Sequence, residues 1–309
     1  MNIPINLVHF FKTNTRLQRG TRMHYHTFIL LIFVFVLSGC SLQKIALKST
    51  TGLFSYGIEA LYSEPDIKIA EQAIASNLKL LEGFHLADPK NKEILYLLTQ
   101  GFASYSLGFL EDDEPERASL FYLRSRDYGF MLLRHTKAFK DSIPVKEVNF
   151  NHNLSRIKES DLPALFWTAF SWAGWVNLNR DDPQAVFELN KVKAMMKRVL
   201  EIDDTFFFGS AHLFFGTINA SLPKMLGGDA EKAKYHFERC LEITSEKFLM
   251  AYVYMARYYA VNTLNEDLFD EALKMVIDAP ADILPGYELM TSVAKNKANR
   301  LIMQRDDLL

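Results

Sequence analysis

Few residues in this sequence have the type and spacing that a chemical reaction needs. The 309 residues include only two cysteines, Cys40 and Cys240, too few for a disulfide framework or a four-cysteine metal site. The eight histidines are scattered, and no HExxH, GxSxG or P-loop pattern occurs. Among the histidines, His212 stands out because its segment is rich in aromatic residues. We expect no enzymatic activity, no cofactor and no bound metal.

Two acidic runs and one glycine pair are better explained as helix ends than as sites. Glu111–Glu114 and Asp203-Asp204 lack the alternating ligand spacing of a calcium loop, so we expect solvated caps, with a cation site as the alternative. Gly227–Asp229 could form a phosphate-binding turn. A helix stop followed by an aspartate N-cap explains the same residues more simply.

Cys40 is the one residue whose surroundings indicate a specific modification. Residues 1–27 carry four basic side chains and no acidic one, and Phe28–Leu37 is a run of ten apolar residues. Ten residues are too few to cross a bilayer, which takes about 20, but they fit the core of a signal peptide. Leu37-Ser38-Gly39-Cys40 follows directly and resembles the lipobox of bacterial lipoproteins.

In lipoproteins the cysteine sulfur receives a diacylglyceryl group and the chain is cut before the cysteine. The resemblance therefore implies a signal peptide over residues 1–39 and a lipid anchor on Cys40. An ordinary cleaved signal sequence with an incidental cysteine is the alternative. Ser41 after the cysteine favours the outer membrane by analogy with enterobacterial sorting, and either Met1 or Met23 could be the start.

Composition limits the remaining classes of protein. The chain is 49% hydrophobic and 23% charged, which excludes a disordered protein and a multi-span membrane protein. The formal net charge of -2 argues against a nucleic-acid partner.

The pattern of residues 40–309 predicts a single all-α domain of stacked antiparallel helical hairpins. No alternating strand run or Asn-Gly turn occurs, and Asp88-Pro89 and Asp182-Pro183 suit an N-cap followed by the first helical residue. We expect the polar segment 139–160 to be an irregular loop. The expected helices are 44–62, 66–86, 91–110, 115–136, 162–179, 184–201, 206–222, 229–243, 246–262, 267–278 and 286–306.

An internal repeat supports the stacked arrangement. A small residue, an aromatic residue and another small residue recur at the same spacing, each set 17 residues after a glycine. This spacing resembles the second helix of a tetratricopeptide repeat and predicts a degenerate solenoid of that type. The two sets are Ala118, Tyr122 and Ser125, and Ala233, Phe237 and Cys240.

Aromatic residues mark the candidate binding surface. Trp167, Trp172 and Trp175 point to different sides of one expected helix, so a single core face cannot hold them all. That helix is either buried on several sides or partly lines a cavity or a partner surface. We take these three residues, with His212 and Asn219 on the next aromatic-rich helix, as candidates for lining a ligand or partner site.

Nearly the whole mature chain, from about residue 50 to 302, resembles the TatT component of the tetratricopeptide-associated TRAP-type transport systems of bacteria. The resemblance rests on short segments spread along the chain. These are Gly101–Tyr105, Glu111–Asp113, Pro115–Ala118, Tyr122–Tyr128, Phe170–Trp175, Leu222-Pro223, Gly227–Asp229, Lys232-Ala233, His236-Phe237, Phe248–Ala251 and Ala256–Val261.

The resemblance implies a periplasm-facing lipoprotein that assembles as a homotrimer and pairs with a periplasmic solute-binding protein. Such a protein would help pass a small ligand towards a membrane permease. It implies no residue-level ligand site. The alternative from another class is a scaffold lipoprotein that uses tetratricopeptide repeats in envelope assembly, and a periplasmic enzyme is a third. Neighbouring genes for a solute receptor and a permease would favour the transport role.

Overall fold

The computed structural model describes residue 54 and residues 56–309. The predictions for the signal peptide and for Cys40 lie outside these residues. Ser55–Leu309 forms one compact unit with its own apolar core. The all-α prediction is confirmed, because the described residues contain helices and no strand.

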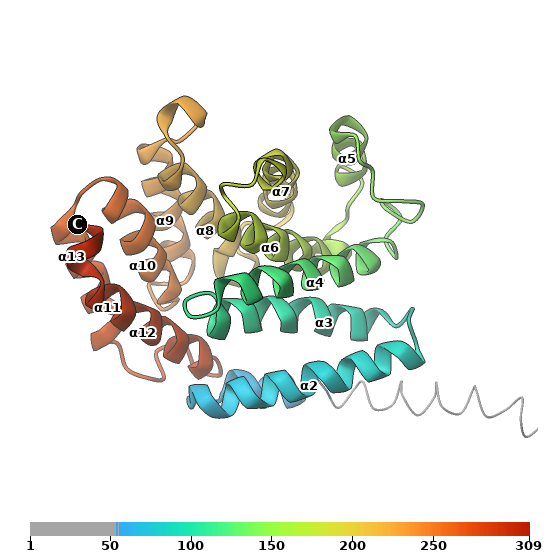
Figure 1. The fold of residues 1–309 in the computed structure, drawn as a ribbon, viewed down its shortest axis with the longest axis horizontal. Helices are drawn as coiled ribbons and strands as arrows, with labels where there is room; N and C mark the ends of the chain where they lie inside the picture. The colour runs from blue at the N-terminus through green and yellow to red at the C-terminus, as the bar shows by residue number, and fades with distance from the viewer. Residues whose placement is uncertain (1–53, 55) are drawn as a thin grey trace, which may run out of the picture. The chain divides into compact units, whose positions relative to one another are not determined.

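The helices follow one another along an arc, and α12 at the end of the arc contacts α2 at its beginning (Figure 1). Each consecutive pair from α2 to α4, and from α6 to α9, packs together, and α6 also contacts α3 and α4. Helical residues 56–62 precede α2. The elements are α2 (Ile67–Ala87), α3 (Lys92–Tyr105), the π-helical turn η1 (Ser106–Leu110), α4 (Pro115–Leu133), α5 (Glu147–Leu154), the short turn η2 (Glu159–Asp161), α6 (Leu162–Leu178), α7 (Pro183–Ile202), α8 (Phe206–Ser221), η3 (Lys224–Leu226), α9 (Ala230–Ile243), α10 (Met250–Tyr254), the π-helical turn η4 (Met255–Ala260), α11 (Glu266–Asp278), α12 (Glu288–Met303) and α13 (Arg305–Leu308).

Side-chain caps fix where several helices begin. Asp182 caps α7 as predicted, and Asp229 caps α9 after Gly227, which has the left-handed φ of 92° that ends η3. The prediction for Asp88-Pro89 was wrong. Asp88 ends α2, and the side chain of Asn91 accepts the first free N–H groups of α3 instead.

Small residues let neighbouring helices approach closely where an aromatic ring lies between them. A Cβ atom on Gly174 of α6 would lie 2.5 Å from the Tyr122 ring of α4, and one on Gly216 of α8 would lie 3.0 Å from the Phe237 ring of α9. Tyr122 and Phe237 are the aromatic residues of the two repeat sets, and both are buried. The aromatic residue of each repeat set therefore lies at a close contact between two helices.

The prediction of an irregular loop over 139–160 was wrong in part, because this segment contains α5. Phe150 and Leu154 of α5 are buried, and the Phe150 ring packs 5.5 Å from Phe139 and 6.3 Å from Trp172. Two apolar anchors are enough to dock this eight-residue helix.

Charged residues close the arc between α12 and the turn before α4. Lys297 lies 2.6 Å from Asp112, and Arg300 pairs with Asp113 at 2.6 Å. The Lys297 side chain is only 5% exposed, and that of Asp112 is 21% exposed. The prediction of solvated caps was therefore wrong for Asp112, which joins distant parts of the chain.

Candidate functional site

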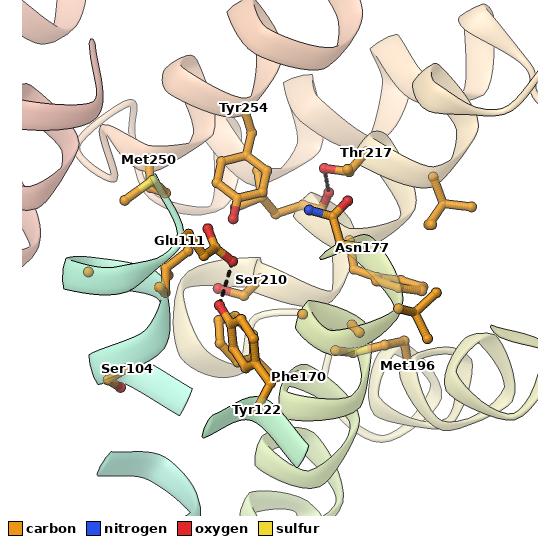
Figure 2. Close-up of a pocket in the computed structure, with 18 of the residues that line it drawn as sticks. Ser104, Glu111, Tyr122, Phe170, Asn177, Met196, Ser210, Thr217, Met250 and Tyr254 are labelled. Atoms are coloured by element: carbon orange, nitrogen blue, oxygen red, sulfur yellow. Dashed lines mark hydrogen bonds between the residues drawn. The ribbon is translucent and has the colours of Figure 1, made fainter. Parts of the chain in front are cut away.

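A cavity of about 320 Å³ lies inside the arc, between η1, α6, α7, α8, α10 and α12. Its wall is largely apolar and includes Trp167, Phe207 and Leu213. Figure 2 shows two further apolar members of the wall, Phe170 and Met250. A volume of this size falls within the range of small-molecule sites, which also tend to be apolar with a few polar groups. The cavity is therefore the candidate functional site.

Backbone irregularities adjoin the cavity on several sides. The π-helical turn η1 contributes Leu107, Gly108 and Phe109 to the wall, and Tyr254 enters it just before η4. A π turn holds one more residue than an α turn, so it changes the direction of side chains and often occurs at functional sites. These turns place side chains around the space where regular helices would close together.

The start of α8 is strained where it meets the cavity. Phe207, Phe208 and Gly209 have left-handed φ values of 46°, 61° and 69°. Such angles are costly for a residue with a large side chain. They bring the Phe207 ring into the wall, 4.8 Å from Trp167, while the Phe208 ring stacks 5.1 Å from Phe248.

One end of the wall is polar. The Tyr122 hydroxyl donates a hydrogen bond to Glu111 at 2.6 Å, and the Tyr254 hydroxyl points toward the same carboxylate (Figure 2). Burial raises the pKa of both tyrosines well above the ordinary value, and Glu111 raises the pKa further. Both hydroxyls therefore remain protonated and able to donate.

Asn177 and Arg180 extend the polar wall along the end of α6. The Asn177 amide donates to the Tyr258 hydroxyl at 3.3 Å, and the Arg180 guanidinium donates to the Asn177 side-chain oxygen. The Arg180 guanidinium also lies over the Tyr258 ring, 5.6 Å from its centroid. Arg180 is exposed to solvent while lining the cavity, so it lies at an opening.

Residues 63–309 match the family model described as TAtT, TRAP transporter T-component. The chain belongs to this family. The match confirms the resemblance found in the sequence and supports an accessory role in TRAP transport. No curated protein matches the chain.

Of the three candidate tryptophans of this T-component, only Trp167 lines the cavity. Trp172 donates its indole N–H to Glu188 at 2.7 Å, and the Arg126 guanidinium lies 5.7 Å from the ring centroids of both Trp172 and Trp175. Both side chains are buried outside the cavity wall. The helix is buried on several sides and also partly lines the cavity, so each of the two alternatives describes part of it. Contact of Trp172 or Trp175 with a partner stays a prediction.

His212 and Asn219 also lie outside the cavity wall. His212 is 4% exposed, and its Nδ1 lies 2.8 Å from Nδ1 of His236 on α9. Burial lowers the pKa of both imidazoles, and proximity to His212 helps to lower that of His236 to about 4. The Asn219 amide donates to the Phe215 carbonyl at 2.8 Å. These contacts join α8 to α9 and stabilise α8.

The structure adds no metal centre or membrane span to the described part of the chain. Residues 56–309 contain no cluster of three or more ligating side chains suited to a metal ion. Over the same residues, no helix has both the length and the apolar character needed to cross a bilayer. Sequence reasoning missed the role of Glu111, which was grouped with the helix-end acids, and of Asn177 and Arg180, which carry no motif.

Proposed function

We propose that this T-component is a periplasm-facing lipoprotein that binds the solute-binding protein of its transport system and holds a small ligand in the cavity. In this proposal residues 1–39 are a signal peptide, Cys40 carries the lipid anchor at the outer membrane, and residues 40–309 form one domain. The apolar cavity is the observation that carries the proposal. The family supplies the transport context.

The cavity suits a ligand better than it suits a structural role. Protein interiors are packed to crystal density, and an unfilled apolar space lowers stability. This space is lined by aromatic and aliphatic side chains, and two of its walls contain strained or π-helical backbone. A bound apolar molecule would restore the contacts that the wall residues lack.

An apolar rim beside the cavity supports a protein partner. Val186 and Leu226 line the cavity and are nevertheless 55% and 68% exposed. Their chain neighbours Phe187 and Met225 are 70% and 98% exposed. Exposed apolar side chains grouped at an opening are typical of interaction surfaces, so the solute-binding protein is expected to cover this rim.

A cavity-filling variant tests ligand binding. Ala173 lines the cavity, and Ala173→Leu places extra carbons there. We expect this variant of residues 55–309 to bind the apolar fluorophore N-phenyl-1-naphthylamine about tenfold more weakly than the parent chain, because the space is filled. Ala194→Leu on α7, outside the wall, is the matched control. Equal fluorophore binding by the parent and Ala173→Leu would contradict the proposal.

Partner binding is tested with a solute-binding protein of the same transport system. Light scattering gives the mass of each protein alone and mixed. We expect the T-component alone to be a homotrimer and to form a complex with the solute-binding protein. Phe187→Asp at the rim should weaken this complex. A monomer that does not bind the solute-binding protein and instead binds envelope-assembly proteins would support the scaffold alternative.

A further inference from the structure

One cation on the wall of the cavity has no counter-ion. Arg180 contacts the Asn177 oxygen and the Tyr258 ring, and it forms no ion pair within residues 56–309. Asp181 and Asp182 follow it in the chain, but neither pairs with it. The Asp182 side chain instead accepts from the backbone N–H of Gln184 at 2.8 Å, as the cap of α7.

The other charges at this end of the cavity neutralise one another. Asp112 pairs with Lys297 at 2.6 Å and with Arg257 at 3.2 Å. Glu111 lies 3.5 Å from Lys297 and accepts the Tyr122 hydrogen bond. Two carboxylates therefore face two cations here, and Arg180 adds one positive charge that the protein leaves uncompensated.

We propose that Arg180 and Asn177 bind the anionic head of an amphipathic monocarboxylate whose apolar body lies in the cavity. The proposal rests on the proposed ligand-binding role and specifies the class of ligand. A guanidinium presents a planar set of N–H donors that matches a carboxylate in two-point contact. Stacking on Tyr258 and the bond to Asn177 hold the guanidinium at the opening.

The rest of the wall limits the ligand to one charge. Glu111 and Arg180 are the only charged side chains among the described residues that line the cavity, and the rest of the wall is mainly apolar with a few hydroxyl groups, such as those of Ser210, Thr217 and Ser221. A second carboxylate placed there would lose its hydration without a second cation to pair with, at a large cost. A chain or ring of carbon atoms fits there instead.

Three probes with the same chain and different heads test the proposal on residues 55–309 at neutral pH: decanoate, 1-decanol and decylamine. Calorimetry should show decanoate binding about tenfold more tightly than 1-decanol, and protonated decylamine binding most weakly. Arg180→Gln should remove the difference between decanoate and 1-decanol, and Arg180→Lys should keep part of it. Arg134→Gln, which changes an exposed arginine outside the cavity wall, should leave the affinities unchanged.

The outcomes separate this proposal from the ligand-binding role on which it rests. Equal affinities for decanoate and 1-decanol in the parent chain, or no effect of Arg180→Gln, would overturn the anion site while leaving the cavity a binding site. If folded Arg180→Gln loses the same amount of affinity for decanoate and for 1-decanol, the anion site would also be overturned. Failure of all three probes to bind the parent chain would overturn both.

Discussion

Gly174 of α6 has no room for a methyl group. A Cβ atom there would lie 2.5 Å from two atoms of the Tyr122 ring and 2.7 Å from a third. Tyr122 is 1% exposed, and a shift of its ring into the cavity that it lines would strain the hydrogen bond from its hydroxyl to Glu111. Gly174→Ala must therefore push α4 and α6 apart or break the bond at the polar wall.

The net effect is a balance of two terms. Replacing glycine by alanine inside a helix favours the helix by about 1 kcal/mol. Overpacking a well-filled core costs roughly 1–3 kcal/mol and occasionally more, and three close ring atoms place this site at the upper end. We expect the free energy of unfolding to fall by about 2 kcal/mol, which lowers Tm by roughly 4–8 °C in a domain of this size.

Thermal and denaturant unfolding of residues 55–309 measures the effect, and the chain offers a matched control. Gly83 in α2 has no atom within 4 Å of its Cβ position, so Gly83→Ala should raise stability by about 0.5–1 kcal/mol. In a Tyr122→Leu background, Gly174→Ala should lose most of its cost, because the ring is absent. A Gly174→Ala protein as stable as Gly83→Ala would refute the close contact between α4 and α6.

Four further predictions follow from particular contacts. Ala233→Leu should lower the free energy of unfolding by roughly 1–3 kcal/mol, because Ala233 is fully buried between helices; an unchanged melting curve would contradict this packing. Lys297→Met should destabilise by about 2–4 kcal/mol, because it removes the ammonium that lies between the largely buried carboxylates of Glu111 and Asp112 and leaves Arg257 as the one cation paired with Asp112, whereas Lys274→Met at an exposed pair should change stability by less than about 0.5 kcal/mol; equal losses would contradict the difference in burial. Burial lowers the pKa of His212 and lowers that of His236 to about 4. At a pH below the ordinary histidine pKa of about 6.5, the unfolded chain therefore binds more protons than the folded chain. Stability should therefore fall as the pH drops from about 6.5 towards 4, and the denaturant midpoint of His236→Gln should vary less over this window; identical pH profiles would contradict the buried pair. Cys40→Ser should release the protein from the membrane fraction, and a variant still bound without another anchor would contradict the lipid attachment.

The helices could be predicted from the sequence because their ends carry local signals. Asp182 with Pro183, and Gly227 with Asp229, supply caps that act within a few residues, so the predicted starts of α7 and α9 lie within one residue of the observed ones. The α5 helix was missed because only Phe150 and Leu154 anchor it. Two apolar residues within a polar segment give no clear period.

The cavity could not be predicted from the same signals. A dense aromatic segment such as Phe166–Trp175 has the same pattern whether its rings fill a core or line a space. Trp167 lines the cavity while Trp172 and Trp175 do not, and tertiary packing alone separates them. The polar wall is formed by residues more than 60 positions apart in the chain, such as Glu111, Asn177 and Tyr254, and no local motif connects them.

The irregular backbone around the cavity shows what this fold favours over regular packing. Regular aromatic-rich helices would be expected to interdigitate and fill the centre of the arc. Instead η1 is π-helical, and Phe207 and Phe208 adopt left-handed angles that cost of order 1–3 kcal/mol each. These angles occur where the Phe207 ring contacts Trp167, with 4.8 Å between the ring centroids. The chain therefore keeps a strained wall around an apolar space, which a scaffold that needed only its outer surface would have no reason to retain.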